Sequence, residues 1–291
     1  MFKPKSLIIF CLGWSATLLL MPSLKAQDEK NAAFSTPLLE KIEVDPTYAQ
    51  VYSDYRIRTV ELGSIVLRDA FVSPLRLVGS GFKVGYNRLH YTPQTLKEYS
   101  TGLFSGLAAD PSTEFTLMLL NFSGQYSWQF PVLEKKGWQG YVGPWAQGFG
   151  NARFALQNVN NVLGYDAGLD LGVTGRLAYK FKPGRREFIL TQQLSIPLAS
   201  GFVRPLYTFT GPIIGETDTE VSIFQFGTLN RRFGWMYKAS LDLYRNHKRK
   251  KQVIARVPYR ISYSFQYDQF KKPNPVQSAI QTITISRILK Y

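Results

Sequence analysis

Residues 276–291 read VQSAIQTITISRILKY and end the chain on an aromatic side chain. Successive side chains of a β-strand point to opposite faces, so a strand over this stretch has two different faces. The apolar face consists of Ile283, Ile285, Leu289 and Tyr291. The polar face consists of Thr282, Thr284, Ser286 and Lys290. The stretch therefore predicts an amphipathic strand, with Arg287 as the one charged residue on its apolar face.

The same alternation recurs along the chain and is clearest in residues 163–181. Every aromatic residue of this segment is at an odd position, and its charged residues are all at even positions: Asp166, Asp170, Arg176 and Lys180. An alternation of this length exceeds the ~5–6 residues of a usual strand and the ~9–11 residues that a tilted membrane strand needs. Residues 253–267 repeat the pattern, with Arg256 and Arg260 on the polar face.

Ten segments predict strands: 59–69, 79–91, 118–130, 138–153, 163–181, 186–198, 220–230, 233–246, 253–267 and 276–291. Two further segments, 100–109 and 201–211, are weaker because they are rich in glycine or contain proline. We favour about twelve strands, with ten as the alternative. Ten strands would leave residues 200–218 as a long loop at the end of a barrel that also holds the C-terminus, where the connections of a membrane barrel are normally short.

The first 26 residues have the pattern of a secretory signal peptide. Lys3 and Lys5 precede an apolar stretch over 7–21, and Ala26 provides a small residue at the expected cut. An uncleaved membrane anchor is the alternative. Cys11 is the only cysteine, so the mature chain would contain neither disulfides nor cysteine-ligated metals.

The rest of the chain divides into a polar arm and a barrel. Residues 27–56 are polar with two prolines and are predicted to form a periplasmic arm, followed by the barrel over 57–291. The formal charge of +15 becomes +12 once the three lysines before the cut are removed. An exported protein rarely meets nucleic acid, so this charge favours lipopolysaccharide phosphates and anionic lipid headgroups as partners.

A chain that stops on an aromatic-ended amphipathic strand resembles the outer-membrane β-barrels of double-membrane bacteria. The resemblance implies an all-β, antiparallel, up-and-down barrel in the outer membrane, whose last strand is the signal for the barrel-assembly machinery. No stretch of the mature chain approaches 18 apolar residues, so only a closed barrel could satisfy its backbone groups in lipid. A soluble lipid-binding barrel is the alternative, with its apolar faces turned inward.

Residues 69–79, DAFVSPLRLVG, and residues 103–108, LFSGLA, suggest a narrower group. They resemble segments of an uncharacterised family of exported barrels from Bacteroides-like bacteria. This resemblance implies the barrel fold and transfers no catalytic residue.

The polar faces supply the candidate functional residues. We expect the lumen to be lined by Asp166, Asp170, Arg176, Lys180, Arg256 and Arg260. Outer-membrane acyl hydrolases use a histidine followed two residues later by a serine, and neither His90 nor His247 has this neighbour. We therefore expect no catalysis, metal or cofactor, and a structural or adaptor barrel or a narrow channel. A lipid hydrolase or acyltransferase is the alternative.

Overall fold

The computed structural model describes residues 54–69, 73–110, 115–135, 137–155, 163–181, 183, 187–203, 224–249, 252–271 and 275–290. The predicted signal peptide and most of the predicted arm lie outside these residues. Strand β1 begins at Asp54, so the last three residues assigned to the arm belong to the barrel. No helix in the described part is long and apolar enough to cross a membrane.

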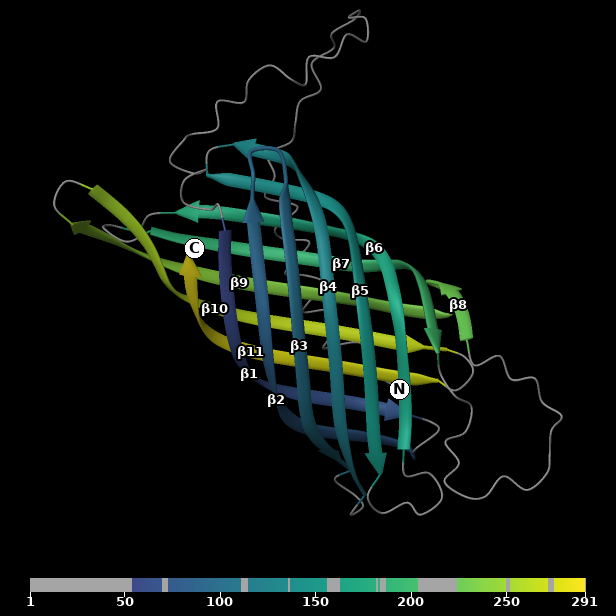
Figure 1. Cartoon of the computed structure of the whole chain (residues 1–291). Helices are drawn as coiled ribbons and strands as arrows, with labels where there is room; N and C mark the ends of the chain where they lie inside the picture. Colours follow the sequence, from purple (N-terminus) through teal and green to yellow (C-terminus); the bar gives the residue numbers. More distant parts are fainter. Residues whose placement is uncertain are drawn as a thin grey trace, which may run out of the picture. The chain divides into compact units, whose positions relative to one another are not determined.

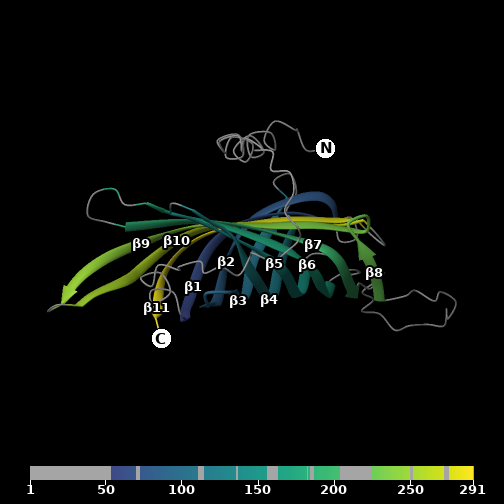
Figure 2. The same cartoon turned by 90° about the horizontal axis from the view of Figure 1, so that it is seen from above.

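The described part consists of β-strands: β1 (Asp54–Asp69), β2 (Ser73–Tyr91), β3 (Leu96–Ala109), β4 (Thr116–Lys135), β5 (Trp138–Ala155), β6 (Leu163–Phe181), β7 (Glu187–Val203), β8 (Phe224–Thr228), β9 (Arg232–Arg249), β10 (Gln252–Phe270) and β11 (Val276–Lys290). Their hydrogen-bonded order is β6-β5-β4-β3-β2-β1-β11-β10-β9-β7, and β6 also pairs with β7. The sheet is thus a closed antiparallel ring of ten strands, in which the first and last strands lie side by side (Figure 1, Figure 2). This confirms the predicted antiparallel barrel.

The short strand β8 explains why the ring has ten strands and not the favoured twelve. β8 pairs with residues 199–203 of β7, while β9 pairs with residues 187–195 of the same strand. β8 therefore extends the edge of β7 and does not form a separate crossing. Of the two weaker predicted segments, 201–211 does not form a separate strand among the described residues and supplies only the end of β7. In contrast, 100–109 belongs to a full strand, β3.

The two ends of the barrel differ in their connections. β1 begins and β11 finishes at one end, which we call the terminal end. Its connections are short: 92–95, 136–137, 182–186 and 250–251. The opposite end, here the loop end, has the connection 204–223. The ten-stranded ring therefore does not place this long connection at the end with the short turns, so the argument that favoured twelve strands was wrong. In outer-membrane barrels, short turns are typical of the periplasmic side.

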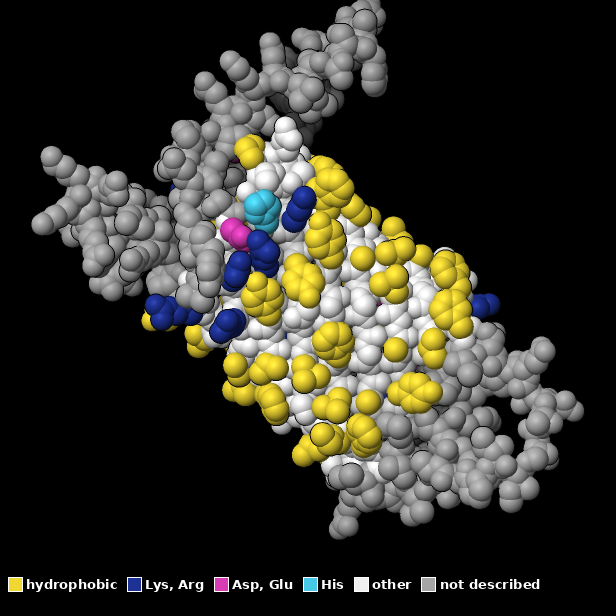
Figure 3. Space-filling model, viewed as in Figure 1, with side chains coloured by type: hydrophobic (Ala, Val, Ile, Leu, Met, Phe, Trp, Pro, Cys, Tyr) yellow, Lys and Arg dark blue, Asp and Glu magenta, His cyan; other side chains and the backbone are white. Residues whose placement is uncertain are grey.

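The apolar strand faces point outward and the polar faces point inward. On β11, Ile283 and Ile285 are 61% and 70% exposed, whereas Thr282, Thr284 and Ser286 are buried. On β6, Tyr165 and Leu169 are exposed while Asp166 and Asp170 are buried. The apolar side chains gather over the outer face (Figure 3). This arrangement is the opposite of a soluble lipid-binding barrel, and a soluble monomer rarely exposes so large an apolar surface.

We call the band of exposed apolar side chains on the outer face the apolar belt. On two neighbouring strands, an exposed arginine lies at each edge of this belt. On β1, Arg58 and Arg68 are both exposed and are separated by residues 59–67. On β2, Arg76 and Arg88 are exposed and are separated by residues 77–87. Both intervals match the ~9–11 residues with which a tilted β-strand crosses the hydrocarbon core. The charges thus mark two levels where the belt meets a more polar environment.

Candidate functional site: the barrel lumen

The middle of the lumen holds a polar cavity of about 80 Å³. That is enough for several water molecules, each of which needs roughly 10–15 Å³ by this measure. Hydroxyl and amide side chains dominate its wall, among them Thr59, Ser100, Ser123, Gln125, Ser195, Ser262, Thr282 and Thr284. We call this cavity the central chamber.

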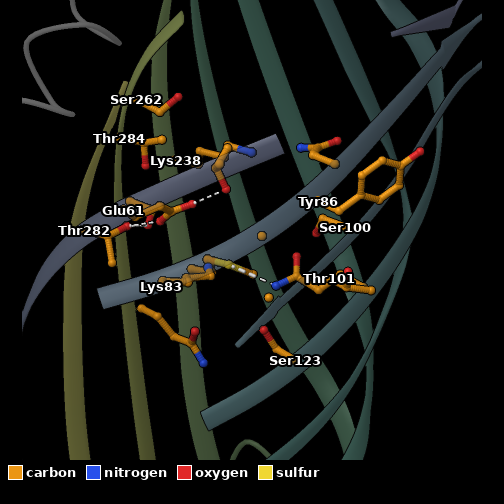
Figure 4. Close-up of a pocket in the computed structure, with 18 of the residues that line it drawn as sticks. Glu61, Lys83, Tyr86, Ser100, Thr101, Ser123, Lys238, Ser262, Thr282 and Thr284 are labelled. Carbon is orange, nitrogen blue, oxygen red and sulfur yellow. Dashed lines mark hydrogen bonds between the residues drawn. The ribbon is translucent and has the colours of Figure 1, made fainter. Parts of the chain in front are cut away.

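Charged side chains of both signs lie in the wall of the chamber: Glu61, Glu98, Lys83, Lys238 and Arg260. Glu61 accepts hydrogen bonds from the hydroxyls of Thr59 at 3.1 Å and Thr282 at 2.5 Å. Lys83 and Lys238 line the same cavity from β2 and β9. Figure 4 shows Glu61 and Thr282 pointing toward each other, with Lys83 and Lys238 in the same cavity. The chamber can therefore hold water or a small polar solute next to groups of both charges.

Glu98 bridges the lumen on the terminal side of the chamber. Its carboxylate lies 3.8 Å from the Nζ of Lys238 and 3.4 Å from a guanidinium nitrogen of Arg176, and it accepts a 2.9 Å hydrogen bond from Asn87. Glu98 belongs to β3 and Lys238 to β9, and these strands are five places apart in either direction around the ring. Side chains from opposite walls thus meet in the middle of the lumen.

A second ion pair and an apolar cluster lie toward the same end. Arg260 on β10 binds Asp242 on the adjacent β9 through two contacts, at 2.5 and 2.7 Å. The terminal cluster consists of the buried residues Tyr55, Ile57, Leu89, Leu96, Ile189 and Ile288, against which Tyr91, Tyr141 and Ala178 pack. This cluster lies on the terminal side of the chamber, and its member Ile57 also lines the cavity.

A larger apolar cluster lies on the loop side of the chamber. The loop cluster consists of Ile65, Leu67, Leu77, Phe104, Ala108, Leu117, Leu119, Phe149, Ala155, Phe202, Phe270 and Val276. The rings of Phe149 on β5 and Phe270 on β10 are 6.2 Å apart, although these strands are not neighbours in the ring. Phe104 belongs to this cluster and also lines the chamber.

Arg232 is held inside the loop cluster. Its guanidinium lies 3.8 Å from the ring centre of Phe149 and 4.8 Å from that of Phe270. It binds Asp170 at 2.5 Å and Asp268 at 3.2 Å, and the Ser200 hydroxyl donates to Asp170 at 2.7 Å. A buried arginine is tolerated here because two carboxylates neutralise it.

Asp166 anchors a separate network on the same side. It pairs with Arg153 and accepts a hydrogen bond from Asn151, which in turn accepts one from Asn121. These residues come from β4, β5 and β6, three adjacent strands. The network therefore ties one wall of the barrel together and does not cross the lumen.

The structure places the predicted lumen residues as follows. Asp166, Asp170, Arg176 and Arg260 are buried on the inner side, and Lys180 is half-buried. The side chain of Arg256, the side chain of Leu289 and all of Tyr291 lie outside the described residues. The prediction did not include Glu98, Arg232 or Lys238, although Lys238 lies on the polar face of a predicted strand. Glu98 precedes the predicted start of its strand, at residue 100, so the alternation gave no signal for it.

His90 lies on the outer face near the terminal end, in register with Asp54 and Lys97. The side chain of the second histidine, His247, lies outside the described residues. Among the residues that the structure describes, no group of three or more His, Cys, Asp or Glu side chains is placed to hold a metal ion.

Solved outer-membrane barrels resemble this chain in structure. The outer-membrane protease OmpT from Escherichia coli has a TM-score of 0.44 at 6% identity, covering 82% of this chain and 96% of its own. The translocator domain of the autotransporter NalP from Neisseria meningitidis has a TM-score of 0.41 at 8% identity, covering 82% and 88%. An outer-membrane channel from Pseudomonas putida F1 has a TM-score of 0.33 at 10% identity, covering 82% and 96%.

No family model matches the sequence, and no curated protein matches it. The resemblance of residues 69–79 and 103–108 to an uncharacterised exported family therefore stays a prediction.

Proposed function

We propose that this chain is an integral outer-membrane barrel without catalytic activity, which acts as a structural or adaptor barrel and does not conduct in this conformation. The observation that carries the proposal is the contact between Glu98 and Lys238, which join opposite walls of the ring. Apolar clusters lie on both sides of the chamber next to this contact. Ten strands are also close to the eight-stranded barrels whose interiors are filled by side chains.

The test has two parts. Protein extracted from the outer-membrane fraction should migrate faster on SDS gels before boiling than after it, because a closed barrel resists the detergent. The same protein, reconstituted into planar bilayers, should show no steady conductance. Recovery of the protein from the periplasm without detergent would contradict the membrane location, and a steady conductance of the unaltered protein would contradict the sealed lumen.

A gated narrow channel is the second candidate, because the central chamber is polar and has an apolar cluster on each side. Apolar constrictions can gate a pore by excluding water. Replacing one side chain in each cluster, Phe104→Ala with Leu96→Ala, should open a conducting path if the chamber belongs to a pore. The gel shift on boiling verifies that the variant still forms a barrel, and a folded variant that stays silent argues against the channel.

The absence of catalysis is tested separately. His90 is exposed on the outer face, where lipid substrates would be within reach, so it is the residue to examine. Phospholipid and lipid A deacylation assays should show no activity with the wild-type protein. Activity that disappears in His90→Ala would replace this proposal with the lipid-modifying enzyme. The barrel-assembly machinery and lipopolysaccharide are proposed partners on the basis of the final strand and the net charge.

A further inference from the structure

Two exposed arginines face each other where the apolar belt ends at the terminal end. Arg58 on β1 is directly opposite Arg287 on β11, and both side chains point outward and are exposed. Opposed residues in antiparallel strands have Cβ atoms roughly 4.5–5.5 Å apart, and like charges in such a pair destabilise the sheet. An anion next to both guanidinium groups would remove this cost.

Within the described part of the chain, little negative charge lies at this place. Asp54 is the outward acid nearby, and it is bound to Arg88 through two contacts, at 3.1 and 2.8 Å. Among the described residues, no carboxylate lies within ion-pair distance of Arg58 or Arg287. Lys97 adds a further positive charge on β3. Figure 3 shows Lys and Arg side chains gathered on this face, beside the apolar side chains of the belt.

The arginine pair lies at the edge of the apolar belt. The next outward residues toward the middle of the belt are Val60 on β1 and Ile285 on β11, which are 67% and 70% exposed. Aromatic side chains flank the pair: Tyr86 is in register with Arg58, and its ring lies 6.5 Å from that of Tyr99. Tyrosine and tryptophan form girdles at the interfaces of outer-membrane barrels.

We infer that Arg58 and Arg287 bind the phosphate of an anionic phospholipid in the leaflet at the terminal end. Guanidinium groups bind phosphate oxygens in bidentate geometry, and two from adjacent strands can hold one phosphate between them. The short connections assign this end to the periplasmic side, where the leaflet consists of phospholipid and not lipopolysaccharide. This inference rests on the proposed location in a membrane.

The test compares lipid binding by the double variant Arg58→Gln/Arg287→Gln with that by a matched control, Arg68→Gln/Arg231→Gln. The control removes the same charge from exposed arginines at the loop end. Each protein is titrated with phosphatidylglycerol or phosphatidylcholine in neutral-detergent micelles, and bound lipids are counted by native mass spectrometry. Wild type and control should prefer phosphatidylglycerol by about thirtyfold, because each of the two arginines near an anionic headgroup contributes about a fivefold factor. The double variant should lose this preference.

Equal preference in the double variant and the control, or no preference in the wild type, would overturn the inference. The gel shift on boiling shows that each variant is folded. Insertion into vesicles that resists alkaline extraction tests the membrane location itself. A protein that inserts without lipid preference contradicts only the arginine site, whereas a protein that fails to insert contradicts the proposed function.

Discussion

Replacing Asp170 by alanine should destabilise the barrel strongly, because it leaves a buried arginine without its nearest counter-charge. The side chains of Arg232 and Asp170 are each 1% exposed, and the two are joined at 2.5 Å. Removing one partner of a buried ion pair costs about 3–5 kcal/mol. Asp268 remains 3.2 Å from Arg232 and keeps part of the compensation. The free energy of unfolding should therefore fall by about 3 kcal/mol, at the low end of that range.

Two further variants make this magnitude testable. Asp268→Ala should cost only about 1 kcal/mol, because its side chain is 17% exposed and Asp170 still neutralises the arginine. The double variant Asp170→Leu/Arg232→Met should be close to wild type in stability, since apolar replacement of a buried pair is often neutral or stabilising. It would place apolar side chains among the rings of Phe149 and Phe270.

The assay is urea unfolding of the reconstituted barrel, followed by tryptophan fluorescence and by the fraction that shifts on gels. The order of the three variants in unfolding free energy tests the reasoning more strictly than the value for any one of them. Two results would refute the reasoning: an unfolding free energy no lower for Asp170→Ala than for Asp268→Ala, or a double variant as unstable as Asp170→Ala. Either result would mean that Asp170 does not stabilise the barrel by neutralising the buried Arg232.

The remaining predictions concern the outer face and the strand packing. Ile283→Arg should lower the unfolding free energy by about 2–4 kcal/mol, because this exposed residue lies near the middle of the belt and lipid penalises a charge there; Ile283→Val, measured by the same urea titration, should be nearly neutral. Gly79→Ala should cost about 1–3 kcal/mol, because its Cβ would overlap the backbone of Leu107 and Ala108. Gly150→Ala should be neutral within about 0.5 kcal/mol, since nothing lies within 4 Å of the added carbon; equal effects of the two would contradict the packing argument.

The alternation of side chains was enough to predict most strands and their orientation. Residues 163–181 form β6 with the predicted bounds, because a period of two can be recognised directly in the sequence. Alternation does not specify a strand's partner, however. Residues 220–230 alternate, yet the described strand there is β8, which pairs only with the end of β7. The number of strands in the ring therefore could not be fixed from pattern alone.

Contacts between side chains inside the lumen also depend on the arrangement of the strands, which alternation does not specify. Arg260 and Asp242 are in register on adjacent strands, so their pairing follows from the strand order once the two polar faces are aligned. Glu98 and Lys238 belong to strands on opposite sides of the ring, and their contact depends on the diameter of the closed barrel. That diameter follows from the strand number and register, which the sequence pattern left open.

The contact between opposite walls of the lumen thus depends on a few long side chains and not on strand number alone. A ten-stranded ring is wide enough to leave the central chamber, and narrow enough for Glu98 to reach both Arg176 and Lys238. Shorter side chains at these positions would leave the backbone ring unchanged while removing the contact between its walls. Conduction in a relative with the same ring would then be decided at such inward positions, whereas the outward belt and its arginines would be needed in either case.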